Sequence, residues 1–260
     1  MSEAVSIQSS VAHGPGIAVC HLPGRVPGVL FCPGFMSDME GTKARALEDH
    51  CQRGGRAFTR FDYSGHGQSG GTVMDGTIGG WLADTLAVID RATDGKLLVV
   101  GTSMGGWLAL LAALARPRRV GALLLLAPAP DFTEDILWNG FADGQRDRLM
   151  KEGHIALPSA YGDGPYIFTR GLIEEGRRHL LLGHEIDLDI PLRIIHGQAD
   201  ADVPWRHALR IVEKLRGGDV AITLVKSGDH RLSRPADIRR MTRQVDELLS
   251  LIGDRPPPAA

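Results

Sequence analysis

The sequence has few of the features that would associate it with a metal or a disulfide framework. Its three cysteines, Cys20, Cys32 and Cys51, are too few and too irregularly spaced for a disulfide-rich domain or a Cys-x-x-Cys metal site. They predict thiols that behave as small apolar side chains in a reducing compartment. The histidines show no pairing at the spacings of a zinc site. We therefore expect no metal and no cofactor.

An excess of one charge and a long apolar run are also missing. The 29 Lys and Arg residues nearly balance the 31 Asp and Glu residues, so no nucleic-acid partner is predicted. No run approaches the roughly 20 apolar residues of a membrane span, so we expect no stable membrane insertion. A small-molecule or acylated substrate is the predicted partner, and the oligomeric state stays open. Residues 1–13 lack the pattern of a signal or transit peptide, which predicts a cytoplasmic location.

The order of apolar segments predicts an α/β fold. A chain of 260 residues can form one large domain of this class. Short apolar runs alternate with longer amphipathic ones, which is typical of βαβ units and a mostly parallel sheet. The predicted strands are an edge strand at 5–9 and strands at 17–22, 29–32, 57–62, 97–102, 122–127, 192–196 and 221–225. The predicted helices are 42–53, 78–93, 104–115, 207–215 and 236–251.

The alternation stops between Asp131 and Asp189, over a stretch too long for an ordinary connection between strands. Its aromatic residues, mixed with charges and glycines, predict short helices packed over the sheet as a cap. An insertion remote from the site is the alternative, although functional loops of such folds gather at the carboxyl ends of the strands. The predicted organisation is therefore a core of 1–130 and 189–255, a cap of 131–188 and a disordered, proline-rich tail of 256–260.

The pentapeptide Gly101-Thr102-Ser103-Met104-Gly105 stands between an apolar run and an Ala/Leu-rich helical run. It has the Gly-x-Ser-x-Gly form and the strand–turn–helix flanks of a nucleophile elbow. The glycines are required because the serine occupies a strained turn on which larger neighbours would collide with the strand and the helix. Ser103 is therefore the candidate nucleophile, and a plain Gly/Ser turn is the alternative.

A serine hydroxyl needs a base, and the base needs a group that orients it. The apolar strand 192–195 leads into a polar turn that carries Asp200, four residues before Pro204. This position places a carboxylate at the carboxyl end of a strand. Asp202 is the rival acid, and a charge at the start of the next helix is its other interpretation.

The predicted base is His230, which follows the last predicted strand, 221–225. The order Ser103, Asp200, His230 is the one expected of an α/β-hydrolase and differs from the orders in chymotrypsin and subtilisin. His66 is a weaker candidate, because it precedes the serine and belongs to a glycine-rich turn that we interpret as scaffold.

Acyl transfer also requires donors for an oxyanion. We expect the backbone NH of Met104, directly after the nucleophile, and that of Phe35, in the loop after strand 29–32, to supply them. An ordinary strand-to-helix turn is the alternative for the Phe35 loop.

Four further residues are expected to line the substrate pocket: Met36, Trp138, Val203 and Trp205. For the two tryptophans, a purely structural position is an equally good prediction.

The segments 33–44, 60–65 and 227–231 carry a resemblance to a known family. The chain resembles the α/β-hydrolase superfamily over nearly its whole length. More narrowly, these three segments resemble the branch that contains a mitochondrial palmitoyl-protein thioesterase that also acts as an acyl-glucuronide esterase. The Gly41-Thr42-Lys43 segment makes this resemblance specific, because the fold does not demand it. The resemblance implies an α/β-hydrolase fold, with a mostly parallel eight-stranded sheet, flanking helices and a helical cap. It also implies a catalytic triad of Ser103, Asp200 and His230.

These observations predict a serine hydrolase that cleaves carboxylic esters or thioesters through an acyl-enzyme. A peptidase or acyltransferase on the same fold is one alternative. A ligand-binding protein without catalytic activity is another, because a fold does not fix a function. An enzyme with an aspartate nucleophile is disfavoured, since Ser103 occupies the elbow.

Overall fold

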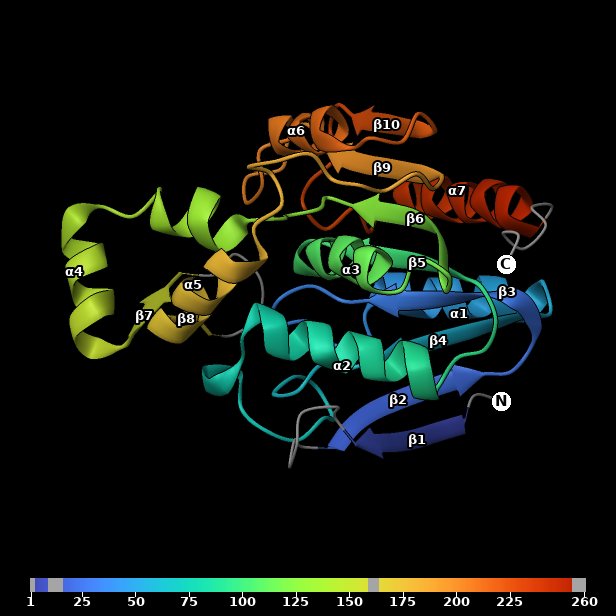
Figure 1. Ribbon diagram of the computed structural model, residues 1–260, viewed down its shortest axis with the longest axis horizontal. Coiled ribbons are helices and arrows are strands. Elements are labelled where there is room, and N and C mark those ends of the chain that lie inside the picture. Colours follow the sequence, from blue (N-terminus) through green and yellow to red (C-terminus); the bar gives the residue numbers. More distant parts are fainter. Residues whose placement is uncertain (1–2, 9–15, 159–163, 254–260) are drawn as a thin grey trace.

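The computed structural model describes residues 3–8, 16–158 and 164–253. In this part of the chain an eight-stranded sheet has helices on both faces (Figure 1). Its strands are β1 (Glu3–Gln8), β2 (Gly16–Leu22), β3 (Arg25–Cys32), β4 (Arg56–Phe61), β5 (Leu97–Thr102), β6 (Val120–Leu126), β9 (Leu192–Gly197) and β10 (Val220–Val225). They lie in the order β1-β2-β4-β3-β5-β6-β9-β10. Of the eight described strands of this sheet, β2 alone runs opposite to the others, so the predicted fold class is confirmed.

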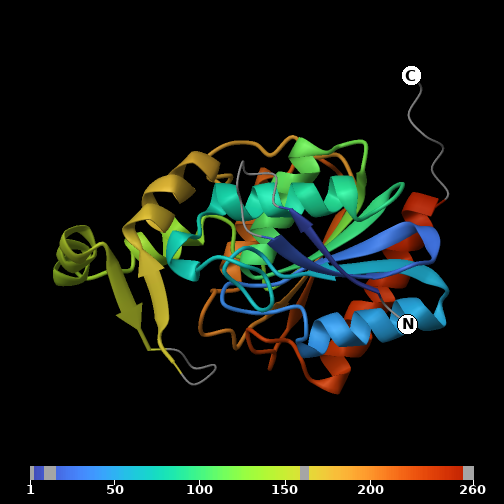
Figure 2. The same cartoon turned by 90° about the horizontal axis from the view of Figure 1, so that it is seen from below.

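Two layers of helices bury the sheet. The helices that flank it are α1 (Thr42–Arg53), α2 (Ile78–Arg91), α3 (Met104–Ala115), α6 (Arg206–Lys214) and α7 (Pro235–Gly253), with a short 3-10 turn η1 (Val73–Asp75) before α2. Figure 2 shows α2 and α3 on one face of the sheet and α1 and α7 on the other. The bounds of α1 and α3 agree with the prediction, and those of α2, α6 and α7 differ by one or two residues at one or both ends. No described helix is long and apolar enough to cross a membrane.

The apolar run at 97–100 belongs to the central strand β5. All six of its residues are buried, because helices cover both faces of the sheet at this position. Trp107 of α3 packs on one side, and Leu248 of α7 belongs to the cluster on the other. Each large side chain buried in this way contributes about 1.5–3 kcal/mol. The core therefore fixes the place where β5 ends and α3 begins.

The insertion between β6 and β9 extends beyond the carboxyl ends of the strands, at the left of Figure 1. Its elements are the π-helical turn η2 (Thr133–Trp138), α4 (Asp143–Glu152), β7 (His154–Leu157), β8 (Tyr166–Thr169), α5 (Arg170–Gly176) and the 3-10 turn η3 (Arg177–His179). The prediction of helices alone is incomplete, because β7 and β8 form an antiparallel hairpin. Runs of four residues are too short for periodicity to separate strand from helix. The domain limits at 131 and 188 stay a prediction, and the predicted tail 256–260 lies outside the described residues.

One carboxylate connects the start of this insertion to a segment near its end by hydrogen bonds. Asp131, just after β6, accepts hydrogen bonds from the amides of Leu181 at 2.8 Å and Leu182 at 2.7 Å. The side chain is buried, and burial raises the pKa of the Asp131 carboxyl even though the two amides act in the opposite direction. The segment that leaves β6 is therefore held beside residues 181–182, on the return path toward β9.

The close contact of α3 with the end of β3 predicts that Gly105→Ala is destabilising. A Cβ at Gly105 would collide with the carbonyl oxygens of Cys32 and Pro33, which belong to the backbone and cannot rotate away. We expect a loss of about 1–3 kcal/mol in the free energy of unfolding, as for other overpacked positions. Thermal and urea unfolding measure the change. Gly144→Ala in α4 is the control, because nothing lies within 4 Å of its Cβ position. Equal midpoints for the two variants would contradict the packing argument.

Candidate active site

Ser103 lies on the turn that joins β5 to α3. Its backbone has φ 53° and ψ −121°, a conformation that costs about 1–3 kcal/mol for a residue with a side chain. Surrounding backbone hydrogen bonds hold it there: Ser103 N donates to the carbonyl of Leu126 at 3.0 Å, and the Ser103 carbonyl accepts from Gly106 and Ala129. A Cβ at Gly101 would collide with the Gly105 carbonyl. The small residues predicted on both sides of the serine are thus required by the packing.

Asp200 and His230 come from two loops that dock on each other after β9 and β10. A Cβ at Gly197 would collide with the carbonyl oxygen of Gly228, so the two backbones approach as closely as glycine permits. The amide of Ala199 donates to the same carbonyl at 2.9 Å. Because the two strands are parallel neighbours, both loops emerge at the same edge of the sheet.

These three side chains form one hydrogen-bonded chain. His230 Nε2 lies 3.0 Å from Ser103 Oγ, and His230 Nδ1 lies 2.8 Å from Asp200 Oδ2. The Asp200 side chain is fully buried, whereas 16% of His230 is exposed. The acid that contacts His230 Nδ1 is thus Asp200, while Asp202 is exposed and lines the adjacent cavity.

The Asp200 carboxylate receives four donors. Oδ1 accepts from the amides of Asp202 at 2.9 Å and Val203 at 2.8 Å, and Oδ2 lies 3.2 Å from Nε2 of the buried His196 as well as near His230. Burial alone would raise the pKa of the Asp200 carboxyl, but the hydrogen bonds from His196 and His230 outweigh it and lower the pKa below its ordinary value. Asp200 therefore stays ionised at neutral pH.

Asp200, Asp202 and His230 also form the one group among the described residues whose atoms are close enough to share a metal ion. Its ligand atoms lie within 4.8 Å of one another. The lone pairs of Asp200 are already directed at two amides and two imidazoles. This group fits a hydrogen-bonded carboxylate better than a metal site.

The two predicted oxyanion donors lie beside the serine. Met104 is the first residue of α3, so its amide has no carbonyl partner within that helix. The loop that carries Phe35 packs against the nucleophile, since a Cβ at Gly34 would lie 3.4 Å from Ser103 Cβ. Met36, the residue after Phe35, has a positive φ of 50°.

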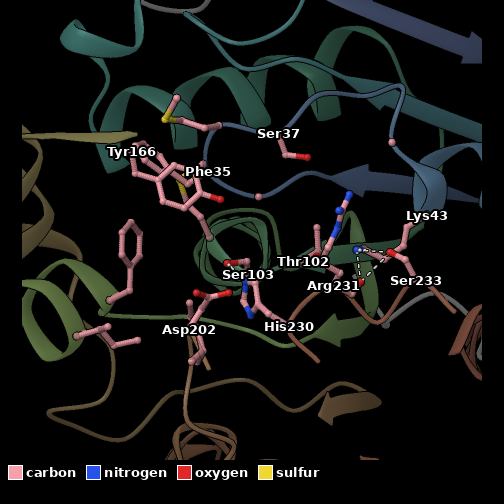
Figure 3. Close-up of a pocket in the computed structure, with 18 of the residues that line it drawn as sticks. Phe35, Ser37, Lys43, Thr102, Ser103, Tyr166, Asp202, His230, Arg231 and Ser233 are labelled. Carbon is pink, nitrogen blue, oxygen red and sulfur yellow. Dashed lines mark hydrogen bonds between the residues drawn. The ribbon is translucent and has the colours of Figure 1, made fainter. Parts of the chain in front are cut away.

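A cavity of about 680 Å³ opens at Ser103. Figure 3 shows Phe35 and Tyr166 on one side of the serine and Lys43, Arg231 and Ser233 on the other. The apolar lining residues also include Phe132, just before η2, Ile136 and Leu137 of η2, and Leu157 and Phe168 of the hairpin β7–β8. The cavity thus has an aromatic and aliphatic arm and a polar arm, with Ser103 between them.

Two of the four predicted pocket residues line this cavity and two do not. Met36 and Val203 are among the lining residues. Trp138 lies away from them because its ring packs against the guanidinium groups of Arg146 and Arg177, 5.6 and 4.8 Å from the ring centroid. Trp205 likewise packs under Arg206 at 4.5 Å. The rings of these two tryptophans therefore pack against arginine side chains of the protein.

The comparison with known families decides the assignment. The family profile described as "Serine aminopeptidase, S33" (Hydrolase_4) matches residues 27–161, more than half of the chain. The chain belongs to this α/β-hydrolase family. It is therefore a hydrolase, and the enzyme class predicted from the elbow is confirmed.

Its relatives place the hydrolase in a narrower branch. Mouse and human "Palmitoyl-protein thioesterase ABHD10, mitochondrial" are each 39% identical to it over 236 residues, which is 90% of this chain and 79% and 77% of the relatives. The structure of mouse α/β-hydrolase domain-containing protein 10 superposes with a TM-score of 0.88 at 35% identity, over 96% of this chain and 99% of that one. A protein from Agrobacterium vitis S4, named as a hydrolase, gives 0.90 at 41% identity over 96% and 98%. The resemblance to this branch is confirmed.

The same relatives contradict the predicted location. All five ABHD10 relatives are named as mitochondrial, so the cytoplasmic prediction is wrong. That prediction relied on the charge and hydropathy of residues 1–13, which do not determine the compartment in which a folded hydrolase works.

Lys43 is a cavity residue that the sequence argument did not assign to the site. Its ammonium donates to the carbonyl oxygen of Arg231 at 2.5 Å and to Ser233 Oγ at 3.5 Å, which ties α1 to the loop of His230 (Figure 3). Burial lowers the pKa of Lys43 to about 8, with a further lowering by the charge of Arg231. The Gly41-Thr42-Lys43 segment, which the fold does not demand, was the signal that could have identified it.

This pKa predicts a pH dependence of stability. Between the folded pKa of about 8 and the unfolded value near 10.4, the unfolded chain binds more protons at Lys43 than the folded protein does. The stability contributed by this position therefore rises with pH in that window. Relative to Lys43→Met, the wild-type protein should gain in urea midpoint between about pH 7 and about pH 9.5.

Lys151→Met is the matched control for this measurement. Lys151 is exposed on α4, and an exposed ammonium loses little hydration on folding. The difference in urea midpoint between Lys151→Met and the wild-type protein should be the same at both pH values. A constant difference for Lys43→Met as well would contradict the burial of its charge.

Proposed function

We propose that this hydrolase cleaves carboxylic esters and thioesters through an acyl-enzyme formed on Ser103. The observation that carries the proposal is the hydrogen-bonded chain from Ser103 Oγ through His230 to Asp200. The names of the ABHD10 relatives, which designate palmitoyl-protein thioesterases, support an acyl thioester as one substrate type.

In the first step Ser103 Oγ attacks the acyl carbon while His230 Nε2 takes the hydroxyl proton. The carbonyl double bond opens and its electron pair moves onto oxygen. When the tetrahedral intermediate collapses, the bond to the leaving oxygen or sulfur breaks and His230 returns the proton to that atom. An alcohol or thiol departs, and the acyl group remains as an ester on Ser103.

In the second step a water molecule replaces the leaving group. His230 takes a proton from this water as its oxygen attacks the acyl-enzyme, and then gives the proton to Ser103 Oγ as the ester breaks. The carboxylic acid is released and the enzyme is restored. No external oxidant, reductant or co-substrate other than water is needed.

The ionised Asp200 supports both steps. Its Oδ2 accepts from His230 Nδ1, which leaves Nε2 free of hydrogen and directed at Ser103. The negative charge also stabilises the imidazolium that forms in each transition state. The lowered pKa of Asp200 means that this charge is present at neutral pH.

The amides of Phe35 and Met104 are proposed to bind the oxyanion. The position of Met104 at the start of α3 supports this role, because the helix dipole and an unused NH both favour negative charge there. The close packing of the Gly34 loop against Ser103 supports the role of Phe35.

The apolar arm of the cavity is suited to the acyl group. Phe168 of the hairpin is 6% exposed and stacks on Phe35 with ring centroids 5.1 Å apart. Tyr166 contacts the same ring at 6.0 Å. An acyl chain that enters this arm would bury methylene groups, each worth about 0.8 kcal/mol, against aromatic surface.

The first test is Ser103→Ala. We expect hydrolysis of p-nitrophenyl esters and acyl-CoA to fall by about four to six orders of magnitude, because the nucleophile is lost. Covalent labelling by a fluorophosphonate probe should be abolished as well. Ser250→Ala, on the exposed face of α7, is the control and should retain both activities. Turnover that survives in a pure Ser103→Ala preparation would rule out Ser103 as the nucleophile.

The second test is Phe168→Ala in the apolar arm. Removing the ring that stacks on Phe35 should leave a cavity beside the acyl group. The acyl length with the highest kcat/KM should therefore move toward longer chains, measured with p-nitrophenyl esters from acetyl to palmitoyl. Active sites are counted by fluorophosphonate titration, and Leu114→Ala, at a position 36% exposed on α3, is the control. An unchanged chain-length profile would show that the acyl group binds elsewhere.

A further inference from the structure

The loop after β3, which carries Phe35, is held by the loop after β4. Met39 N donates to the buried Asp62 carboxylate at 2.7 Å, and the Tyr63 hydroxyl donates to the carbonyl oxygen of Pro33 at 3.3 Å. These contacts fix the two ends of the Phe35 loop. The glycine-rich turn that the sequence suggested as scaffold therefore shapes this loop.

His66, in the same turn, holds the middle of the Phe35 loop. The amide of Met36 lies 3.0 Å from His66 Nε2, and His66 Nδ1 lies 3.2 Å from the carbonyl oxygen of Ser64. An amide can only donate and a carbonyl can only accept, so Nε2 is the acceptor and Nδ1 carries the hydrogen. The imidazole is thus neutral, with one defined tautomer. It is 3% exposed, and its burial lowers the pKa of His66.

The backbone around Phe35 needs such support. Met36 has a φ of 50°, in the left-handed region that residues with side chains rarely occupy. On the other side, Ser37 N donates to the Gly34 carbonyl at 3.2 Å and closes the turn. The Phe35 residue between these bonds has little rotational freedom as long as the Met36 amide keeps its acceptor.

We propose that His66 is a positioning residue that orients the Phe35 amide by accepting a hydrogen bond from Met36. This role rests on the proposed function, in which the Phe35 amide binds the oxyanion. Outright loss of one oxyanion donor slows catalysis by about 100-fold to 1000-fold. Displacing a donor without removing it slows catalysis by a smaller factor. Because the oxyanion exists only in the transition state, the effect falls on kcat and leaves KM nearly unchanged.

Two variants separate the acceptor from the rest of the side chain. His66→Asn keeps a donor for the Ser64 carbonyl but has no atom where Nε2 lies. His66→Gln keeps an acceptor oxygen near that point. We expect His66→Asn to lower kcat by about 10-fold to 100-fold with KM within about twofold. We expect His66→Gln to retain kcat within about threefold.

A trifluoromethyl ketone with the acyl chain of the best ester supplies a readout that loss of stability would not move. It forms a tetrahedral adduct with Ser103, so its inhibition constant reports oxyanion binding. This constant should rise in His66→Asn by the same factor by which kcat/KM falls. His21→Leu is the control, because His21 lies within β2 and its Nδ1 is 2.9 Å from Thr59 Oγ1 of β4. All variants are compared by thermal unfolding and active-site titration.

Two kinetic outcomes overturn the proposal. One is a His66→Asn enzyme with the kcat and the ketone affinity of wild type. The other is an equal loss in His66→Asn and His66→Gln, which would assign the effect to the shape of the imidazole. Should the proposed function itself be wrong, the wild-type protein would hydrolyse no ester and bind no ketone, which is a different result.

Nuclear magnetic resonance of the wild-type protein tests the hydrogen bond without any variant. The ¹⁵N shift of His66 Nε2 should be that of an unprotonated ring nitrogen, with a scalar coupling across the hydrogen bond to the Met36 amide. A protonated Nε2 would overturn the proposal even if neither variant folds.

Discussion

The backbone conformation of Ser103 is the constraint on which the rest of the site depends. A residue with φ 53° at the end of a central strand costs about 1–3 kcal/mol, and the sheet and helix around it must hold it there. The fully buried β5 and the tight contact between Gly105 and the end of β3 provide this support. As a result, the Ser103 side chain lies at the carboxyl edge of the sheet, where His230 of the loop after β10 contacts it.

The carboxylates of Asp62, Asp131 and Asp200 each hold a loop at this edge, but in different electrostatic environments. Asp62 and Asp131 each accept two backbone amides, and burial still raises the pKa of both carboxyls. Asp200 accepts two imidazoles in addition to two amides, and its pKa is lowered. The first two therefore act as fixed acceptors for loop backbone. Of the three, only Asp200 has a lowered pKa, and its carboxylate lies beside His230.

The sequence was sufficient for the strands, the helices of the core and the approach of Ser103, Asp200 and His230. Buried parallel strands have continuous apolar sequences, which makes them recognisable. Because the carboxyl ends of parallel strands lie at the same edge of the sheet, residues that follow different strands are expected to lie close together. The pairing of β7 with β8 was missed because each strand has only four residues.

Side-chain contacts that form only in the folded protein account for what the sequence left open or missed. Trp138 and Trp205 were predicted either at the pocket or in a structural position, and arginines cover their rings. The hydrogen bond from Met36 to His66 joins residues 30 positions apart and leaves no pattern along the chain. Lys43 and Arg231 are separated by 188 positions, and only folding brings them together.

The tether at Asp131 has a consequence for how hydrolases of this kind diversify. The Asp131 carboxylate holds Leu181 and Leu182 beside the segment that leaves β6, so the excursion between them is closed at its base. Lengthening a surface excursion adds only about 0.6 kcal/mol per doubling once its ends are fixed. A change in the length of this excursion therefore has a small entropic cost, and it would alter the residues of η2, β7 and β8 that line the cavity beside Ser103.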